Sequence, residues 1–191
     1  MRSSPLVMIW ATSLLLSGVL AGMPTALAQH ASIYLAGPLG FSEGGREFQD
    51  GLVRQLSELG YHVIDPFKLT DESKIQAVAS LPSSEARREA WKKLDMEIAK
   101  RNQYAIDSCD GILAILDGTD VDSGTAAEIG YAFARRKRIL GYRGDFRLSS
   151  DNEGTAVNLQ VEYFIRASGG DIVFSRSNIP DALSRMFSSK N

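Results

Sequence analysis

The chain has 191 residues, of which 44% are hydrophobic and 23% charged, values that are ordinary for one soluble globular domain. Its formal net charge of -2 provides no basic field for a nucleic acid polymer or an anionic membrane surface. One cysteine, Cys109, excludes an intramolecular disulfide and a cysteine-based zinc site, and two histidines are too few for a histidine-rich metal cluster. We therefore expect chemistry that runs on carboxylates, with no metal.

The first 28 residues have the features of a secretory signal peptide. Arg2 supplies a positive start, a mainly apolar run follows, and Ala26-Leu27-Ala28 fits a signal peptidase site. The apolar run is shorter than the roughly 20 residues that span a bilayer. We expect cleavage before Gln29, export, most simply to the periplasm, and no stable membrane anchor on the remaining domain, residues 29–191. The alternative is a cytoplasmic protein whose translation begins at Met23.

The rest of the chain alternates between short apolar runs, typical of strands, and apolar residues at helical spacing. In chain order, the pattern predicts a strand over residues 32–36, a helix over 42–59, a strand over 61–67, a polar and irregular loop or lid over 68–84, a helix over 85–108, a strand over 111–116, a helix over 125–137, a strand over 138–142, a helix over 158–167, a strand over 171–175 and a helix over 180–187. This alternation predicts an α/β fold: a flavodoxin-like, doubly wound, parallel five-stranded sheet of order 2-1-3-4-5, with helices on both faces.

In a sheet of this order, ligands bind beyond the carboxyl ends of strands 1 and 3. The loop after strand 1 begins with Gly37-Pro38 and carries Phe41, while the loop after strand 3 and the following helix start contain four carboxylates within residues 117–128. This is the densest concentration of polar chemistry in the chain, and it lies where the fold predicts a site.

Two interpretations of Glu128 follow from its position. Thr125-Ala126-Ala127-Glu128 fits a helix capping box, with Thr125 as N-cap and Glu128 bonded to a backbone amide, while Asp122 only turns or caps the loop. Alternatively, the helix dipole favours an ionised Glu128 by about 0.3–1 kcal/mol, which suits a nucleophile. The spacing alone leaves both open.

Three segments in order along the chain resemble the nucleoside 2-deoxyribosyltransferase family. These are Ile33-Tyr34-Leu35-Ala36-Gly37-Pro38, then Cys109-Asp110-Gly111 followed by the block from Asp122 to Ala132 (DSGTAAEIGYA), and finally Val157-Asn158-Leu159. The resemblance implies that Glu128 attacks C1′ of 2-deoxyribose, that a covalent deoxyribosyl-enzyme forms, and that a second base or water takes the sugar. It also implies that Asp122 handles the base, by hydrogen bonding or by protonating the leaving nitrogen.

The same resemblance assigns a substrate-binding set around these two catalytic residues. That set is Tyr34, Gly37, Pro38, Phe41, Asn102, Gly124 and Asn158. Several relatives carry a sugar-binding aspartate where this chain has Asn102, which can hydrogen-bond a hydroxyl but cannot stabilise positive charge. In relatives the equivalent of Asn158 reaches a neighbouring subunit's site, which implies a homo-oligomer.

The leading hypothesis is transfer of 2-deoxyribose between nucleobases, as in nucleotide salvage, with nucleosides and nucleobases as the partners and no cofactor. The first alternative is hydrolysis of 2′-deoxyribonucleosides or of their 5′-monophosphates, for which Ser42 and Arg46 could bind the phosphate. The second alternative is a non-catalytic nucleoside- or nucleotide-binding module, because a fold does not prove an activity.

Overall fold

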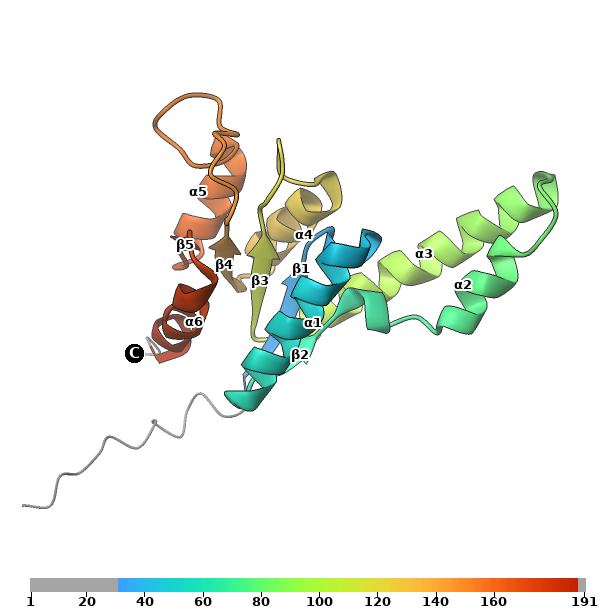
Figure 1. The fold of residues 1–191 in the computed structure, drawn as a ribbon, viewed down its shortest axis with the longest axis horizontal. Coiled ribbons are helices and arrows are strands. Elements are labelled where there is room, and N and C mark those ends of the chain that lie inside the picture. Colours follow the sequence, from blue (N-terminus) through green and yellow to red (C-terminus); the bar gives the residue numbers. More distant parts are fainter. Residues whose placement is uncertain (1–30, 189–191) are drawn as a thin grey trace, which may run out of the picture.

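In the computed structural model, which describes residues 31–188, five strands form one parallel sheet (Figure 1). The strands are β1 (Ser32–Ala36), β2 (His62–Ile64), β3 (Gly111–Ile115), β4 (Arg138–Tyr142) and β5 (Ile172–Val173). Their order is β2-β1-β3-β4-β5, and each neighbouring pair is parallel. The predicted fold class and strand order are therefore confirmed.

Six α-helices lie within the described residues. They are α1 (Glu43–Glu58), α2 (Glu72–Ala79), α3 (Glu85–Ser108), α4 (Ser123–Ala134), α5 (Leu159–Ala167) and α6 (Ile179–Ser188), with short 3-10 turns at η1 (Leu39–Phe41), η2 (Pro66–Lys68) and η3 (Arg176–Asn178). The side chains of β3 show why both faces of the sheet are covered. Ile112 packs with residues of α3, α4 and α5 on one face, whereas Leu113 packs with residues of α1 and α6 on the other.

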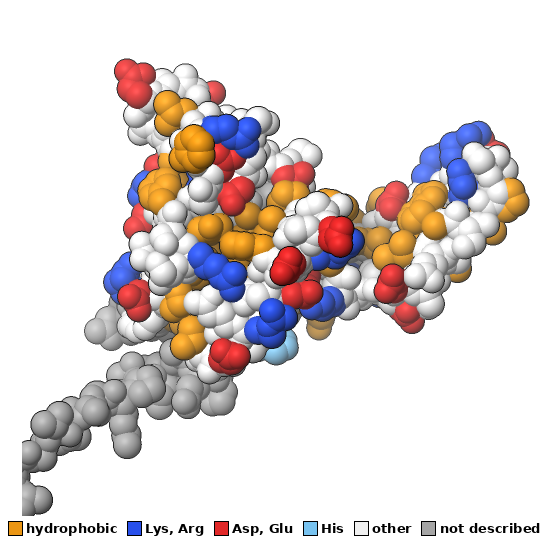
Figure 2. All heavy atoms as spheres, viewed as in Figure 1, with side chains coloured by type: hydrophobic (Ala, Val, Ile, Leu, Met, Phe, Trp, Pro, Cys, Tyr) orange, Lys and Arg blue, Asp and Glu red, His pale blue; other side chains and the backbone are white. Residues whose placement is uncertain are grey.

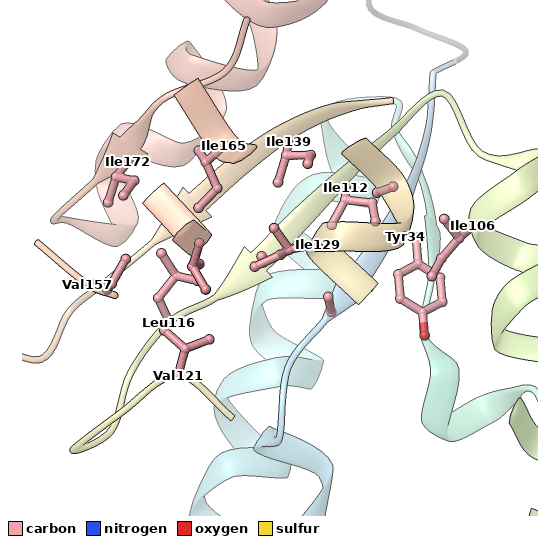
Figure 3. Packing of buried hydrophobic residues seen from close by; sticks show 14 of the residues in the cluster. Tyr34, Ile106, Ile112, Leu116, Val121, Ile129, Ile139, Val157, Ile165 and Ile172 are labelled. Atoms are coloured by element: carbon pink, nitrogen blue, oxygen red, sulfur yellow. The ribbon is translucent and has the colours of Figure 1, made fainter. Parts of the chain in front are cut away.

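Figure 3 shows the first of these two layers, in which Ile112 and Ile139 of the sheet lie with Ile129 of α4 and Ile165 of α5. Each of these four side chains is fully buried. Because successive strand residues point to opposite faces, a strand buried on both sides reads as a continuous apolar run, as β3 does.

The stretch 68–84, which the sequence pattern predicts to be an irregular loop, contains helix α2, so this prediction is wrong. Asp71 caps the helix by accepting a hydrogen bond from the Ser73 amide at 2.9 Å. Together, α2 and the first half of α3 form a helical arm that projects away from the sheet (Figures 1 and 2). No residue of α2 is buried, so the sequence of this helix lacks the apolar periodicity by which a helix is predicted.

Several element ends also differ from the predicted ones. The second strand stops at Ile64 because the Asp65 side chain accepts a hydrogen bond from the Phe67 amide at 3.0 Å and starts η2. The last strand is confined to Ile172–Val173. Helix α4 ends at Ala134, and Arg136 then adopts a left-handed φ of 57°.

The signal peptide prediction falls on residues 1–28, which lie outside the described part of the chain. Within residues 31–188, no helix combines the length and the apolar character that a membrane crossing requires.

We predict that Leu113→Ala lowers the free energy of unfolding by about 2–5 kcal/mol, because Leu113 is fully buried in the central strand and the substitution leaves a cavity. Urea denaturation followed by circular dichroism measures the change. Leu148→Ala is the matched control: its side chain is 79% exposed, and its effect should stay within about 0.5 kcal/mol. Equal losses in the two variants would contradict this assignment of the core.

Candidate active site

A cleft of about 380 Å³ opens at the carboxyl ends of β1 and β3, where the fold predicts a ligand site. One side is built by the loop after β1 and the start of α4, and the other by η2, α2 and α3. The residues that line it are Gly37, Phe41, Pro66, Phe67, Thr70, Ile75, Asp95, Ile98, Asn102, Asp122, Gly124, Thr125 and Glu128. A second hollow, of about 430 Å³, lies between the β2 edge and α3, but no carboxylate lines it.

The central contact in the cleft joins Tyr34 on β1 to Glu128 on α4. The Tyr34 hydroxyl donates a hydrogen bond to Glu128 Oε1 at 2.6 Å, and the Tyr34 side chain is fully buried. In Figure 3 its ring lies beside Ile106. Burial and the neighbouring Glu128 carboxylate raise the pKa of Tyr34, so the phenol keeps its proton and remains a donor.

Glu128 experiences opposing influences on its ionisation. Burial raises the pKa of its carboxyl above the ordinary value, the Tyr34 hydrogen bond lowers it, and the negative charge of Asp122 raises it again, with a net upward direction. A carboxylate that is partly removed from water and held by one donor retains free lone pairs. It is therefore suited to attack a carbon atom that carries developing positive charge.

The capping box that the sequence suggests at Thr125 is not formed, so this part of the structural interpretation is wrong, whereas the capping role that it gave Asp122 is confirmed. The N-cap of α4 is Asp122, whose Oδ2 accepts hydrogen bonds from the Thr125 amide at 3.0 Å and from its hydroxyl at 3.1 Å. With the cap three residues earlier, Glu128 lies beyond the first turn, and its carboxylate is bonded to Tyr34 instead of a backbone amide.

Two neutral polar atoms in the cleft have no hydrogen-bond partner among the described residues: Thr70 Oγ1 and Asn102 Oδ1. Each is shielded from solvent, and an unpaired buried polar atom costs about 1–3 kcal/mol. A ligand with hydroxyl or amino groups would satisfy both atoms, so this part of the cleft is preorganised for a polar partner.

Aromatic side chains form the mouth of the cleft. Phe41 and Phe67 pack edge to face with ring centroids 5.0 Å apart, and Phe41 is 80% exposed. Beneath them, a Cβ atom added to Gly40 would lie 2.4 Å from the Phe67 ring, so only glycine allows this approach. The pair provides flat apolar surface beside the polar floor, as a nucleobase requires.

The structure brings six of the predicted site residues to the cleft wall, and Tyr34 joins them through Glu128. Pro38 and Asn158 are not among the lining residues. Pro38 precedes η1, and its carbonyl accepts a hydrogen bond from the Phe41 amide at 3.1 Å. Asn158 caps α5, its Oδ1 accepting hydrogen bonds from the Gln160 and Val161 amides at 3.0 and 3.4 Å.

In the cleft wall formed by η2, α2 and α3, only Asn102 was found from the sequence. The other side chains on this flank are Pro66, Phe67, Thr70, Ile75, Asp95 and Ile98. The only available signal was the polar stretch between the second strand and the long helix, which suggested a lid but did not specify which residues face the cleft.

The cleft is acidic. Asp95, Asp122 and Glu128 line it, and none of its described lining residues is Lys or Arg. The phosphate-binding candidates Ser42 and Arg46 are not among the lining residues: Arg46 donates to the Gly40 carbonyl at 3.4 Å, and the Ser42 hydroxyl accepts from the Gly45 amide at 3.1 Å. No group of three or more His, Cys, Asp or Glu residues within the described chain is arranged to hold a metal ion.

Comparison with known proteins identifies relatives of this chain. A family model described as nucleoside 2-deoxyribosyltransferase matches residues 33–160. An uncharacterized protein of Schizosaccharomyces pombe is 30% identical over 120 residues, which are 61% of this chain and 51% of that relative. The chain thus spans about half the length of the curated relative it matches.

Two solved structures share the fold. A conserved protein from Enterococcus faecalis V583 is 23% identical, with 82% of this chain and 98% of that chain covered and a TM-score of 0.59. A 2-deoxyribosyltransferase from Bacillus psychrosaccharolyticus is 20% identical, with 78% and 90% covered and a TM-score of 0.52. At these identities the likeness extends to the architecture alone.

We predict that Glu128→Gln stabilises the protein at neutral pH. Because the folded-state pKa of Glu128 is raised, the folded chain holds this proton more tightly than the unfolded chain does, and wild-type stability falls as pH rises through that pKa. Glutamine never ionises, so the variant should not lose this contribution. Urea midpoints at acidic and neutral pH measure the difference.

Glu47→Gln, an exposed glutamate on α1, is the matched control and should follow the wild type at both pH values. The stabilisation by Glu128→Gln should shrink towards zero at pH values below the ordinary glutamate pKa. A variant that is less stable than the wild type at neutral pH would contradict the raised pKa.

Proposed function

Because this chain belongs to the nucleoside 2-deoxyribosyltransferase family, whose model matches more than half of it, we propose that it transfers 2-deoxyribose between nucleobases through an ester on Glu128. The observation that carries the proposal is the Glu128 carboxylate in the acidic cleft, bonded to the buried Tyr34 hydroxyl at 2.6 Å. The family implies nucleoside substrates, and breaking an N-glycosidic bond is the chemistry that such a carboxylate supports.

The proposed reaction has two displacement steps. A Glu128 oxygen forms a bond to C1′ as the bond from C1′ to the base nitrogen breaks, through a transition state with positive charge on the sugar. A second base, or water, then attacks C1′ and restores the carboxylate. Negative charge at Glu128 stabilises both transition states, and the Tyr34 hydrogen bond orients the attacking carboxylate.

The cleft supports a nucleoside in preference to a nucleotide. Its volume of about 380 Å³ falls in the range of small-molecule sites, roughly 300–1,000 Å³. The aromatic pair at the mouth fits a base, while Thr70 and Asn102 offer partners for polar groups. Because the described lining residues include three carboxylates and no cation, a 5′-phosphate would enter an unfavourable electrostatic field.

Apolar side chains favour transfer over hydrolysis, because Phe67, Ile75 and Ile98 on one wall limit the water that can reach the ester. Hydrolysis uses the same nucleophile, and the assay below separates the two reactions. The same assay addresses the binding-module alternative, since a module would bind a nucleoside without consuming it.

We predict that the protein converts 2′-deoxyinosine and adenine to hypoxanthine and 2′-deoxyadenosine, and that Glu128→Ala lowers the rate by about ten-thousandfold or more. Loss of the nucleophile removes the covalent step altogether, whereas nucleoside binding should persist. Chromatography of the four compounds measures the rate, and calorimetry measures binding to the variant.

Glu47→Gln, at an exposed residue that does not line the cleft, should retain wild-type activity. Release of hypoxanthine with free deoxyribose and no 2′-deoxyadenosine would replace the transferase with a hydrolase. Undiminished activity in Glu128→Ala would overturn the nucleophile, and binding without turnover by the wild type would favour the module.

We also predict that kcat/KM for 2′-deoxyinosine exceeds that for its 5′-monophosphate by about tenfold or more at low ionic strength, because the phosphate is repelled by the acidic cleft. Raising the salt concentration should narrow the gap by screening this repulsion. A preference for the monophosphate would show that a cation outside the lining residues reaches the ligand.

A further inference from the structure

The proposed reaction raises the question of how the leaving base acquires a proton. A neutral nucleobase leaves with an electron pair on nitrogen and departs far more easily once it is protonated, so enzymes commonly place a neutral acid beside it. Within the described lining of the cleft, the side chains that could hold such a proton are the carboxyls of Asp95, Asp122 and Glu128. Glu128 is the nucleophile and must be ionised.

Asp122 is built into the fold as a hydrogen-bond acceptor. Its Oδ2 accepts two hydrogen bonds from Thr125, a residue that is only 1% exposed, and it caps the positive end of α4. Because the carboxyl group is committed to this cap as an acceptor, it is poorly placed to donate a proton to the base.

The remaining groups offer no better donor. The Tyr34 hydroxyl is committed to Glu128, and its pKa is raised by burial. Asp95 is exposed on α3. Thr70 and Asn102 can form hydrogen bonds with a ligand, but their side chains do not release protons at neutral pH.

What the cleft does provide is an environment for positive charge. Among its described lining residues are three carboxylates and no Lys or Arg, and Phe41 and Phe67 present ring surface at its mouth. A cation over an aromatic face is attracted by the negative charge density of the ring. Burial and the Asp122 charge raise the pKa of the Glu128 carboxyl. A cationic base beside Glu128 would lower this pKa and would therefore favour the ionised nucleophile.

We propose that the preferred substrates of this cleft are 2′-deoxyribonucleosides whose base already carries a positive charge, such as N7-alkylated purines, with Asp122 as the anionic partner of the base. This inference rests on the proposed function, N-glycosidic cleavage at Glu128, and adds the substrate class. Neutral nucleosides would react in the same way through the small fraction of molecules whose base is protonated in solution.

The step balances without a proton donor. A Glu128 oxygen forms the bond to C1′, the C1′–N bond breaks, and its electron pair cancels the positive charge on the base, which departs neutral. Water then attacks C1′, the ester bond breaks with its electron pair returning to Glu128, and one proton passes to solvent. The sum is a cationic nucleoside plus water giving base, deoxyribose and a proton; a second base in place of water gives transfer.

The test compares 7-methyl-2′-deoxyguanosine with 2′-deoxyguanosine at mildly acidic pH, with the spontaneous rate of each subtracted. We expect wild-type kcat/KM to favour the cationic substrate by about a hundredfold, the scale on which a missing proton donor penalises the neutral one. Asp122→Asn, which preserves an N-cap residue, should lower kcat/KM for the cationic substrate by about tenfold, chiefly through KM, and affect the neutral one less.

The opposite pattern overturns the inference. If Asp122 is a general acid, Asp122→Asn will damage turnover of 2′-deoxyguanosine and spare the methylated substrate, whose base needs no proton. Equal wild-type kcat/KM values for the two substrates would also overturn it, leaving the proposed function intact. If neither substrate is cleaved above its spontaneous rate, the proposed function fails and this inference with it.

Binding to Glu128→Gln provides a measurement that does not depend on the folding of the Asp122 variant. This variant lacks the nucleophile, so calorimetry reports affinity alone. It should bind 7-methyl-2′-deoxyguanosine more tightly than 2′-deoxyguanosine, and raising the ionic strength should reduce the difference. Equal affinities would contradict the electrostatic preference.

Discussion

The hydrogen bond from Tyr34 to Glu128 connects the two elements on which the cleft is built. Tyr34 belongs to β1, which is held between β2 and β3, and Glu128 belongs to α4, which packs over the same sheet. Because the phenol is fully buried and cannot move without disturbing the core, its hydroxyl fixes the position of a carboxylate that would otherwise choose among several rotamers. The position of the Glu128 carboxylate is thus set by a contact with the hydrophobic core, rather than by a loop conformation.

The loop after β3 shows how one run of acidic residues divides between structure and chemistry. Asp117 Oδ1 accepts hydrogen bonds from the Gly144 and Asp145 amides at 2.6 and 2.8 Å, which ties this loop to the one after β4. In return, the buried Arg143 donates to the Leu116 and Gly118 carbonyls at 2.5 and 3.3 Å. Asp117 therefore anchors the loop that leads to the two carboxylates in the cleft, Asp122 at the N-cap of α4 and Glu128 within α4.

The sheet and its order were predictable because β1, β3 and β4 are apolar runs with sharp ends and are buried on both faces. The position of Glu128 was predictable for the same reason, since it follows the third strand at the switch point of the sheet. The cap of α4 was not, because Asp122 and Thr125 both fit an N-cap and only the backbone decides between them. Apart from Asn102, the cleft wall formed by η2, α2 and α3 was missed, because α2 buries none of its residues and no apolar periodicity marks it. Thr70 became notable only once its surroundings left its hydroxyl oxygen unpaired.

The close approach of Gly40 to Phe67 links two segments that lie on opposite sides of the second strand in the sequence. A Cβ atom at position 40 would lie 2.4 Å from the Phe67 ring, so the packing of Phe67 against Phe41 requires a residue without a side chain at position 40. Positions 40 and 67 are consequently not free to vary independently among homologues. Lineages that enlarge residue 40 should carry a smaller residue 67 and a wider entrance, and this paired variation would mark a change in the size of base that each lineage accepts.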